Sequence, residues 1–393
     1  MARSGFLIAL ALLASSAGGA RAAILLSVTR EVTEDTRSSD IMVQSAPLAK
    51  YLSAAIGTEV KISYSQNLTQ ELQDTRTGRF GILFGPAHVI GSALRYGYEP
   101  VAGIPGSEKM VFVVAAGSAI KSLEDLKGKR IGFPSADSLA TYMALGEFNA
   151  KGIQVKTYFK EMKYFRLHEV ALYSLELGVI DVAVAEAQVA QKWLATNKGS
   201  VIYETKSVPN LGFAMHTGLD KAVQLKIRNA LLSPNSKLPS YAPVASLGIA
   251  DFKPIVNADY GYVSTLGYFT PTLLPGIKVV TAEEVGQLMT KAGVVFYDVR
   301  TQREYKEAHV KGALLLPYVE KSKKEVGFDM SVDEFKLAEA LKDKNTRLIF
   351  ACNGGECWKS YKASLWAQKQ GFQDVYWFRG GFPEWKGKSL PVE

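Results

Sequence analysis

Cysteine and histidine are scarce in this sequence. Its 393 residues include two cysteines, Cys352 and Cys357, and four histidines. A structural zinc site needs four such ligands at short, regular spacings, and no segment of this chain offers them. We therefore expect neither a metal nor any other cofactor.

Long apolar runs and a strong excess of one charge are also missing. Beyond the N-terminus, no stretch reaches the ~18 consecutive apolar residues of a membrane-spanning helix. Lysine and arginine (46) exceed aspartate and glutamate (38) by eight, without a polybasic block. The sequence thus argues against nucleic acid as a partner, while its mild basic excess favours small anionic ligands.

The first residues have the pattern of a signal peptide. A basic residue near the start is followed by an apolar run over residues 6–14, which is too short to span a bilayer. Ala20 and Ala22 place small side chains at the two positions that a signal peptidase reads. We predict that residues 1–22 are removed and that the mature chain, from Ala23, is located in the periplasm.

The mature chain is predicted to have α/β architecture in two regions. Short β-branched or aromatic runs alternate with longer helical stretches. Residues 266–277 contain Gly and Pro without apolar periodicity, so we interpret them as a linker between a region of residues 23–265 and a domain of residues 278–393. Strands are expected at 24–29, 60–64, 80–84, 110–115, 179–184, 294–299, 313–316, 348–351 and 374–378, and helices at 45–55, 135–150, 168–178, 220–232, 282–292, 331–342 and 360–370.

Both cysteines lie in one loop between a predicted strand and a predicted helix. A thiol at such a place faces unpaired backbone N–H groups and the positive end of the helix dipole, so we expect Cys352 to have a lowered pKa and to be nucleophilic. Cys357 would act as a resolving thiol or second sulfur carrier, and Lys359 would add positive charge. The remaining candidate residues of this active-site loop are Asn353, Gly354, Gly355, Glu356, Trp358 and Ser360.

The C-terminal domain resembles the rhodanese family. The segments that carry the resemblance are Asp298-Val-Arg300, Glu304, His309-Val-Lys-Gly-Ala313, Pro317 and Gly380-Gly-Phe-Pro-Glu-Trp385. The resemblance implies a parallel-sheet α/β domain in which Cys352 becomes a persulfide, taking sulfur from a sulfane-sulfur donor and passing it to a thiol acceptor. The cysteine loop departs from the family pattern, because Cys357 stands where rhodaneses have an arginine and Lys359 follows two positions later. The loop is therefore about two residues longer.

Residues 23–265 resemble the phosphate/phosphite/phosphonate-type periplasmic substrate-binding proteins of ABC transporters. The resembling stretches are residues 84–88, 122–130, 177–184 and 208–210. The resemblance implies two α/β lobes that close over a small ligand, and an ABC permease as a partner. Asp137 would repel a dianionic phosphonate, so the expected ligand is a small oxyanion or organosulfur compound. The residues that the resemblance places at the ligand are Phe84, His88, Ser135, Ser138, Thr141 and His168.

The primary hypothesis is an exported sulfurtransferase fused to a ligand-binding region. One alternative is a solute-binding component of an uptake or sensing system whose rhodanese-like domain is inert and only docks a partner. Another is a thiol–disulfide protein that uses Cys352 and Cys357 with a periplasmic redox partner. A purely structural disulfide between the same two residues is the remaining alternative.

Overall fold

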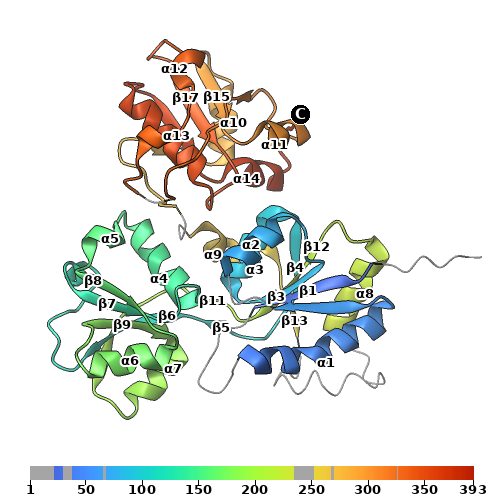
Figure 1. Cartoon of the computed structure of the whole chain (residues 1–393), viewed down its shortest axis with the longest axis vertical. Helices are drawn as coiled ribbons and strands as arrows, with labels where there is room; N and C mark the ends of the chain where they lie inside the picture. The colour runs from blue at the N-terminus through green and yellow to red at the C-terminus, as the bar shows by residue number, and fades with distance from the viewer. Residues whose placement is uncertain (1–21, 30–37, 65–67, 234–251, 267–269, 325) are drawn as a thin grey trace, which may run out of the picture.

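The computed structural model describes residues 22–29, 38–64, 68–233, 252–266, 270–324 and 326–393. The predicted signal peptide lies outside this part of the chain, apart from its last residue. Figure 1 shows two lobes side by side and a C-terminal domain that stands above them. The prediction of a two-lobed region followed by an α/β domain with a parallel sheet is confirmed.

Lobe one is built on a six-stranded sheet in which the first strands of the chain run parallel and β12 runs antiparallel between β3 and β4. One face packs against α1 and α8, and the other against α3. In sheet order the strands are β13 (Lys253–Pro254), β4 (Tyr98–Gly103), β12 (Gly212–His216), β3 (Ile82–Gly85), β1 (Ile24–Val28) and β2 (Val60–Tyr64). The helices are α1 (Ser38–Ile56), α2 (Leu68–Arg76), α3 (Ala87–Ala93), α8 (Lys221–Leu232) and α9 (Gly261–Thr265), with short 3-10 turns at Leu94–Tyr96 and Asn257–Tyr260.

Lobe two is a five-stranded mixed sheet with helices on both faces. The chain passes between the lobes at β5 (Ser107–Glu108) and β11 (Val208–Pro209), which pair with each other in antiparallel fashion. In sheet order the strands are β10 (Gly199–Glu204), β6 (Met110–Ala115), β9 (Val182–Glu186), β7 (Arg130–Phe133) and β8 (Glu161–Tyr164). The helices are α4 (Leu139–Ala150), α5 (Val155–Tyr158), α6 (His168–Glu176) and α7 (Ala187–Leu194), with a 3-10 turn at Glu124–Leu126.

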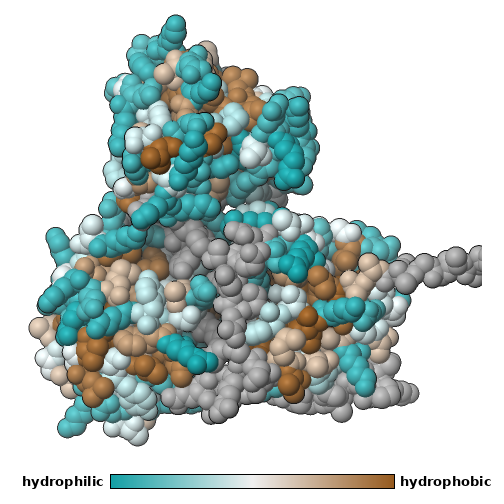
Figure 2. All heavy atoms as spheres, viewed as in Figure 1, coloured by the Kyte–Doolittle hydropathy of each residue, from teal (hydrophilic) through white to brown (hydrophobic). Residues whose placement is uncertain are grey.

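The C-terminal domain has a wholly parallel sheet with helices on both faces. Figure 2 shows that its visible surface is mostly hydrophilic, with small hydrophobic patches. In sheet order the strands are β14 (Lys278–Val279), β18 (Val375–Phe378), β17 (Arg347–Ala351), β15 (Val294–Asp298) and β16 (Leu314–Leu315). The helices are α10 (Ala282–Met289), α11 (Gln302–Glu307), α12 (Leu337–Ala340), α13 (Trp358–Lys369) and α14 (Gly381–Gly387), with a 3-10 turn at Met330–Val332. Within the described residues, no helix is long and apolar enough to cross a membrane.

The prediction of one helix over residues 331–342 is wrong. Asp329 caps a 3-10 turn there, and the short helix α12 begins only at Leu337. The carboxylate of Asp333 is committed elsewhere, because it accepts the hydroxyl of Tyr318 at 2.7 Å and the backbone N–H of Ser322 at 2.6 Å. The local sequence pattern is thus overridden by a buried polar network.

Candidate functional site

Cys352 lies at the carboxyl end of the parallel sheet, directly after β17. The strand before it is apolar and buried, and the cysteine itself is fully buried. Its Sγ lies 3.0 Å from Oγ of Ser360, which also accepts the indole N–H of Trp377 over 3.0 Å. Because the indole already fills an acceptor position of this hydroxyl, the hydroxyl proton is available for the Cys352 sulfur.

Cys357 is the N-cap residue of α13 and is partly exposed. Its sulfur receives a hydrogen bond from the thiol of Cys352 and others from the backbone N–H groups of Asn353 and Lys359, and Lys359 adds positive charge. Together these contacts lower the pKa of Cys357 to about 7, although burial opposes them. Burial, reinforced by the neighbouring Cys357, raises the pKa of Cys352 well above its usual value.

The expectation that Cys352 has a lowered pKa is therefore wrong, because burial raises it. A cradle of N–H groups does exist at the start of the helix, but Cys357 occupies it. The reason is that α13 begins at Trp358, two residues earlier than predicted, so Cys357 stands at the helix terminus. Cys352 stays beneath the loop, where loss of solvent favours the neutral thiol.

Backbone conformation and close packing fix the shape of the loop. Gly354 has a φ of +90°, which disfavours any residue with a side chain. A Cβ at Gly381 would lie 2.2 Å from the carbonyl oxygen of Cys352, so this glycine lets the closing turn approach the loop. The next residue, Phe382, donates its N–H to the same carbonyl at 3.0 Å. The Gly-Gly-Phe turn found by sequence thus supports the cysteine loop directly.

The motif residues that precede the cysteine strand hold the loop from the other side. Asn353 donates its side-chain amide to Glu304 at 2.6 Å. Asp298 and Arg300 form a 2.6 Å ion pair with side chains only 4% exposed, and Arg300 also donates to the carbonyl of Ala308. Since both partners are buried and mutually satisfied, they position the backbone and are not available for chemistry.

Glu356 connects the cysteine loop to lobe one. Its side chain is 3% exposed and lies 2.7 Å from Arg76 and 3.1 Å from Arg95. Burial alone would favour the neutral carboxyl, but the charges of Arg95 and Arg76 lower the pKa of Glu356 below its usual value. The loop that carries both thiols is therefore anchored on another domain.

Arg379 provides a second anchor at the same place. Its guanidinium is buried and donates at 3.0 Å to the carbonyls of Thr265 and Pro271, and less closely to three more carbonyls, including that of Gly355. Burial lowers the pKa of Arg379 to about 10. Thr270 also donates to the carbonyl of Gly355 at 2.6 Å. The end of lobe one and the linker thus pack directly on the loop.

The structure brings together several of the residues expected at the ligand. Ser138 is the N-cap of α4 and accepts the N–H of Thr141 at 3.1 Å, while the Thr141 hydroxyl donates to the carbonyl of Ser135 at 2.9 Å. His88, from α3 of lobe one, has Nε2 3.2 Å from the carbonyl of Asp137. The four residues therefore gather where the lobes meet.

Two other predicted ligand residues have different surroundings. Phe84 lies in β3 and stacks on Phe213 inside the core of lobe one, with ring centroids 4.3 Å apart, which is a core position. Alternation along the strand directs this side chain into the core. His168 begins α6 in lobe two and is buried, with Nδ1 accepting the N–H of Glu186 at 3.0 Å.

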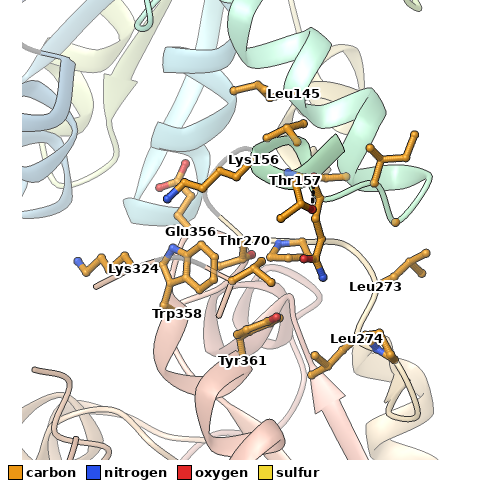
Figure 3. Close-up of a pocket in the computed structure, with 18 of the residues that line it drawn as sticks. Leu145, Lys156, Thr157, Thr270, Leu273, Leu274, Lys324, Glu356, Trp358 and Tyr361 are labelled. Atoms are coloured by element: carbon orange, nitrogen blue, oxygen red, sulfur yellow. Dashed lines mark hydrogen bonds between the residues drawn. The ribbon is translucent and has the colours of Figure 1, made fainter. Parts of the chain in front are cut away.

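A cavity of about 1100 Å³ lies between lobe two, the linker and the C-terminal domain (Figure 3). Its lining includes Glu356 and Trp358, the two neighbours of Cys357. The cavity could not be predicted from the sequence, because its walls come from distant segments. Of the residues that line it, Glu356 and Trp358 were among the predicted site residues. Across the described part of the chain, no three His, Cys, Asp or Glu side chains gather as a metal site requires.

Curated relatives match the chain over part of its length. The tRNA uridine(34) hydroxylase of Erwinia tasmaniensis is 30% identical over 117 residues, which are 28% of this chain and 30% of that protein. Rhodanese-like domain-containing protein 17 of Arabidopsis thaliana is 28% identical over 127 residues, 32% of this chain and 79% of that protein. The chain thus spans less than a third of the hydroxylase.

Family models and a solved structure extend the comparison to the two-lobed region. XAC2383 from Xanthomonas citri, solved bound to ATP, is 18% identical with a TM-score of 0.52, covering 62% of this chain and 95% of that one, which shows a shared fold. The model of the ABC transporter, phosphonate, periplasmic substrate-binding protein matches residues 32–260, and that of the rhodanese-like domain matches residues 281–388. The match to the periplasmic substrate-binding protein model spans more than half of the chain. The chain therefore belongs to the phosphonate-type periplasmic substrate-binding proteins of ABC transporters, and it carries a rhodanese-like domain at its C-terminus.

Proposed function

We propose that this protein is an exported sulfurtransferase in which the two thiols of the rhodanese-like domain carry sulfane sulfur. The observation that supports it most is the state of Cys357, which is partly exposed, hydrogen-bonded by backbone N–H groups and has a pKa near 7. A lowered pKa increases the share of thiolate at neutral pH, and the thiolate is the nucleophile. Cys357 is therefore the entry thiol of the mechanism.

The first step with thiosulfate as donor is a displacement at sulfur. The Cys357 thiolate attacks the outer sulfur, a new S–S bond forms on Cys357, and sulfite leaves with the electron pair of the broken S–S bond. The same N–H groups that stabilise the thiolate then face a persulfide anion. Lys359, whose charge already acts on Cys357, favours an anionic donor.

The persulfide on Cys357 can react in two ways: its outer sulfur can be transferred to an acceptor thiol, or Cys352 can attack the persulfide. In the second reaction, the Cys352 thiolate attacks the inner sulfur of the Cys357 persulfide, forming a Cys352–Cys357 disulfide and releasing hydrosulfide. Ser360 stabilises that thiolate through its hydroxyl, held by Trp377. An external dithiol, such as a periplasmic redox partner, must then supply two electrons to restore both thiols.

The binding region is proposed to deliver or sense a small ligand. The support is the turn at Ser135, Ser138 and Thr141, which opens α4 opposite His88. A helix N-terminus with hydroxyls suits a small oxyanion or organosulfur compound. Export by the predicted signal peptide and an ABC permease as partner complete this proposal.

Intact mass after treatment of the mature chain with thiosulfate tests the function. Gain of one sulfur atom is the expected result. We expect Cys357→Ser to lose this gain, and Cys352→Ser to keep it without forming a disulfide. Uptake in Cys357→Ser but not in Cys352→Ser would overturn the order of the two thiols and restore the one expected from sequence.

The two alternative functions predict different changes in mass in the same experiment. Loss of two hydrogens on mild oxidation, with no sulfur gained from any donor, would favour the thiol–disulfide protein, which the contact between the two thiols also fits. Neither change in mass would favour an inert domain that docks a partner.

A further inference from the structure

The large cavity beside the cysteine loop has a composition that points to a ligand. It is bounded by the end of α4, α5 and β8 on one side and by α13 and the linker on the other. Figure 3 shows Trp358 and Tyr361 of α13 opposite Lys156 and Thr157 of α5. Its volume, about 1100 Å³, is that of a site for a medium-sized organic molecule.

Apolar side chains make up most of its walls, and some of them are left in contact with solvent. Leu273 of the linker is 52% exposed and Tyr164 at the end of β8 is 47% exposed. Beside them lie Leu274, Trp358 and Tyr361, which belong to or pack on the apolar core. An apolar ligand body would remove these surfaces from water, which favours its binding.

The charges around the cavity are unbalanced toward the positive. Arg76, Lys156 and Lys324 contribute to its lining, and Glu356 is the one acid among its described lining residues. Glu356 is already held between Arg76 and Arg95. Lys324 reaches an acid outside the lining only at 3.9 Å and is 65% exposed. Lys324 therefore offers a positive charge to an anionic group on the ligand.

The cavity also adjoins the reactive loop. Glu356 and Trp358 both line it, and Cys357 stands between them in the chain. We propose that this cavity binds the sulfur acceptor, and that the acceptor is a small thiol with an apolar body and a carboxylate end. This inference rests on the proposed function, since it names the substrate class of the same site.

The transfer step that the cavity would serve is balanced without further reagents. The acceptor thiol passes its proton to the Cys357 persulfide anion, and the resulting acceptor thiolate attacks the outer sulfur and forms a new S–S bond. The S–S bond to Cys357 breaks, and Cys357 leaves as a thiolate with the electron pair. The acceptor departs as a persulfide, and the enzyme is ready for another donor molecule.

Acceptor kinetics with thiosulfate as donor test this inference on the mature full chain. We expect 8-mercaptooctanoate to have a KM at least tenfold below that of 2-mercaptoethanol, which has neither apolar body nor carboxylate. Leu273→Ser and Lys324→Ala should each raise the KM for mercaptooctanoate about fivefold, with kcat unchanged. Equal KM values for the two acceptors in the unmodified protein would overturn the inference.

Matched control variants separate the cavity from general surface effects. Leu225→Ser changes an equally exposed leucine on α8, and Lys336→Ala changes an exposed lysine that also has a carboxylate neighbour. Neither residue lines the cavity, so neither variant should move the KM. A shift as large in the controls as in the cavity variants would contradict the assignment.

Calorimetric titration with octanoate separates this inference from the proposed function, because octanoate has no sulfur. It should bind the Cys357→Ser protein and bind about fivefold more weakly when Leu273→Ser is added. Normal sulfur uptake without octanoate binding would overturn the inference alone. Octanoate binding that depends on Leu273, in a protein that takes up no sulfur, would overturn the proposed function alone.

Discussion

The carboxylate of Glu356 and the guanidinium of Arg76 form a 2.7 Å ion pair between positions 280 residues apart in the chain. Glu356 belongs to the cysteine loop, whereas Arg76 ends α2 in lobe one. An event in the binding region that moves α2 must therefore break this pair or move the loop with it. The carboxylate of Glu356 is buried and also lies close to Arg95. Breaking the pair with Arg76 would therefore remove one of the two positive charges that stabilise a buried carboxylate.

Glu356→Gln is expected to destabilise the protein by about 1–3 kcal/mol, because it leaves two arginines facing a neutral group. Thermal unfolding followed by calorimetry measures this effect. Glu307→Gln is the matched control, since Glu307 pairs with Arg303 on the exposed surface at 3.8 Å, and the substitution should cost no more than about 0.5 kcal/mol. Equal losses in the two variants would mean that the interdomain pair contributes nothing.

The reactivity of Cys357 should follow its lowered pKa. The thiolate is the reactive form, so alkylation by iodoacetamide should accelerate as pH rises through about 7 and then level off. Peptide mapping should find the label on Cys357 before Cys352, whose pKa is raised. First labelling at Cys352 would contradict the assignment of the two thiols.

Lys359→Ala should move the alkylation midpoint of Cys357 to higher pH, because it removes a positive charge that favours the thiolate. Lys369→Ala, at the exposed far end of the same helix, is the control and should leave the midpoint in place. The measurement is the same labelling series. An unchanged midpoint in Lys359→Ala would show that the backbone N–H groups act alone.

Lys362 should be essential for the stability of the C-terminal domain. Its ammonium is fully buried, 2.8 Å from Glu320 and 2.7 Å from the hydroxyl of Ser322, with Asp333 at 3.9 Å. Lys362→Met would leave two carboxylates without their cation, at a cost of about 3–5 kcal/mol. Chemical unfolding should show this loss, and Lys369→Met should show almost none.

The N-cap of α4 should serve both stability and ligand binding. Ser138→Ala is expected to cost about 1 kcal/mol through the lost cap and also to abolish any rise in Tm caused by sulfate, phosphate, methylphosphonate or methanesulfonate. Asp220→Ala removes the N-cap of α8 at a similar cost, and its ligand-induced rise in Tm should persist. Ligand responses that are identical in both variants would exclude α4 from the binding site.

Sequence patterns predicted many of the buried central strands, among them β1, β3, β6 and β17, but missed β4 of lobe one and both edge strands of lobe two. The edge strand β8 (Glu161–Tyr164) has no fully buried residue, and β10 (Gly199–Glu204) on the opposite edge has none either. Without a buried face, such strands lack the apolar alternation that identifies a strand. The helices predicted at 220–232 and 282–292 do begin at the N-caps Asp220 and Thr281, because each helix cap depends on residues three or fewer positions away.

The sequence by itself determined the α/β architecture, the order of the rhodanese-like motifs and the meeting of both cysteines in one loop, since these follow from local periodicity, capping and spacing. Tertiary structure alone decided which thiol is acidic, because Cys352 is desolvated while Cys357 meets the helix N–H groups. It also decided that Glu356 joins two domains and that a cavity opens beside the loop. Burial and electrostatic interaction depend on distance in space, and for these groups the neighbours in space are remote in sequence.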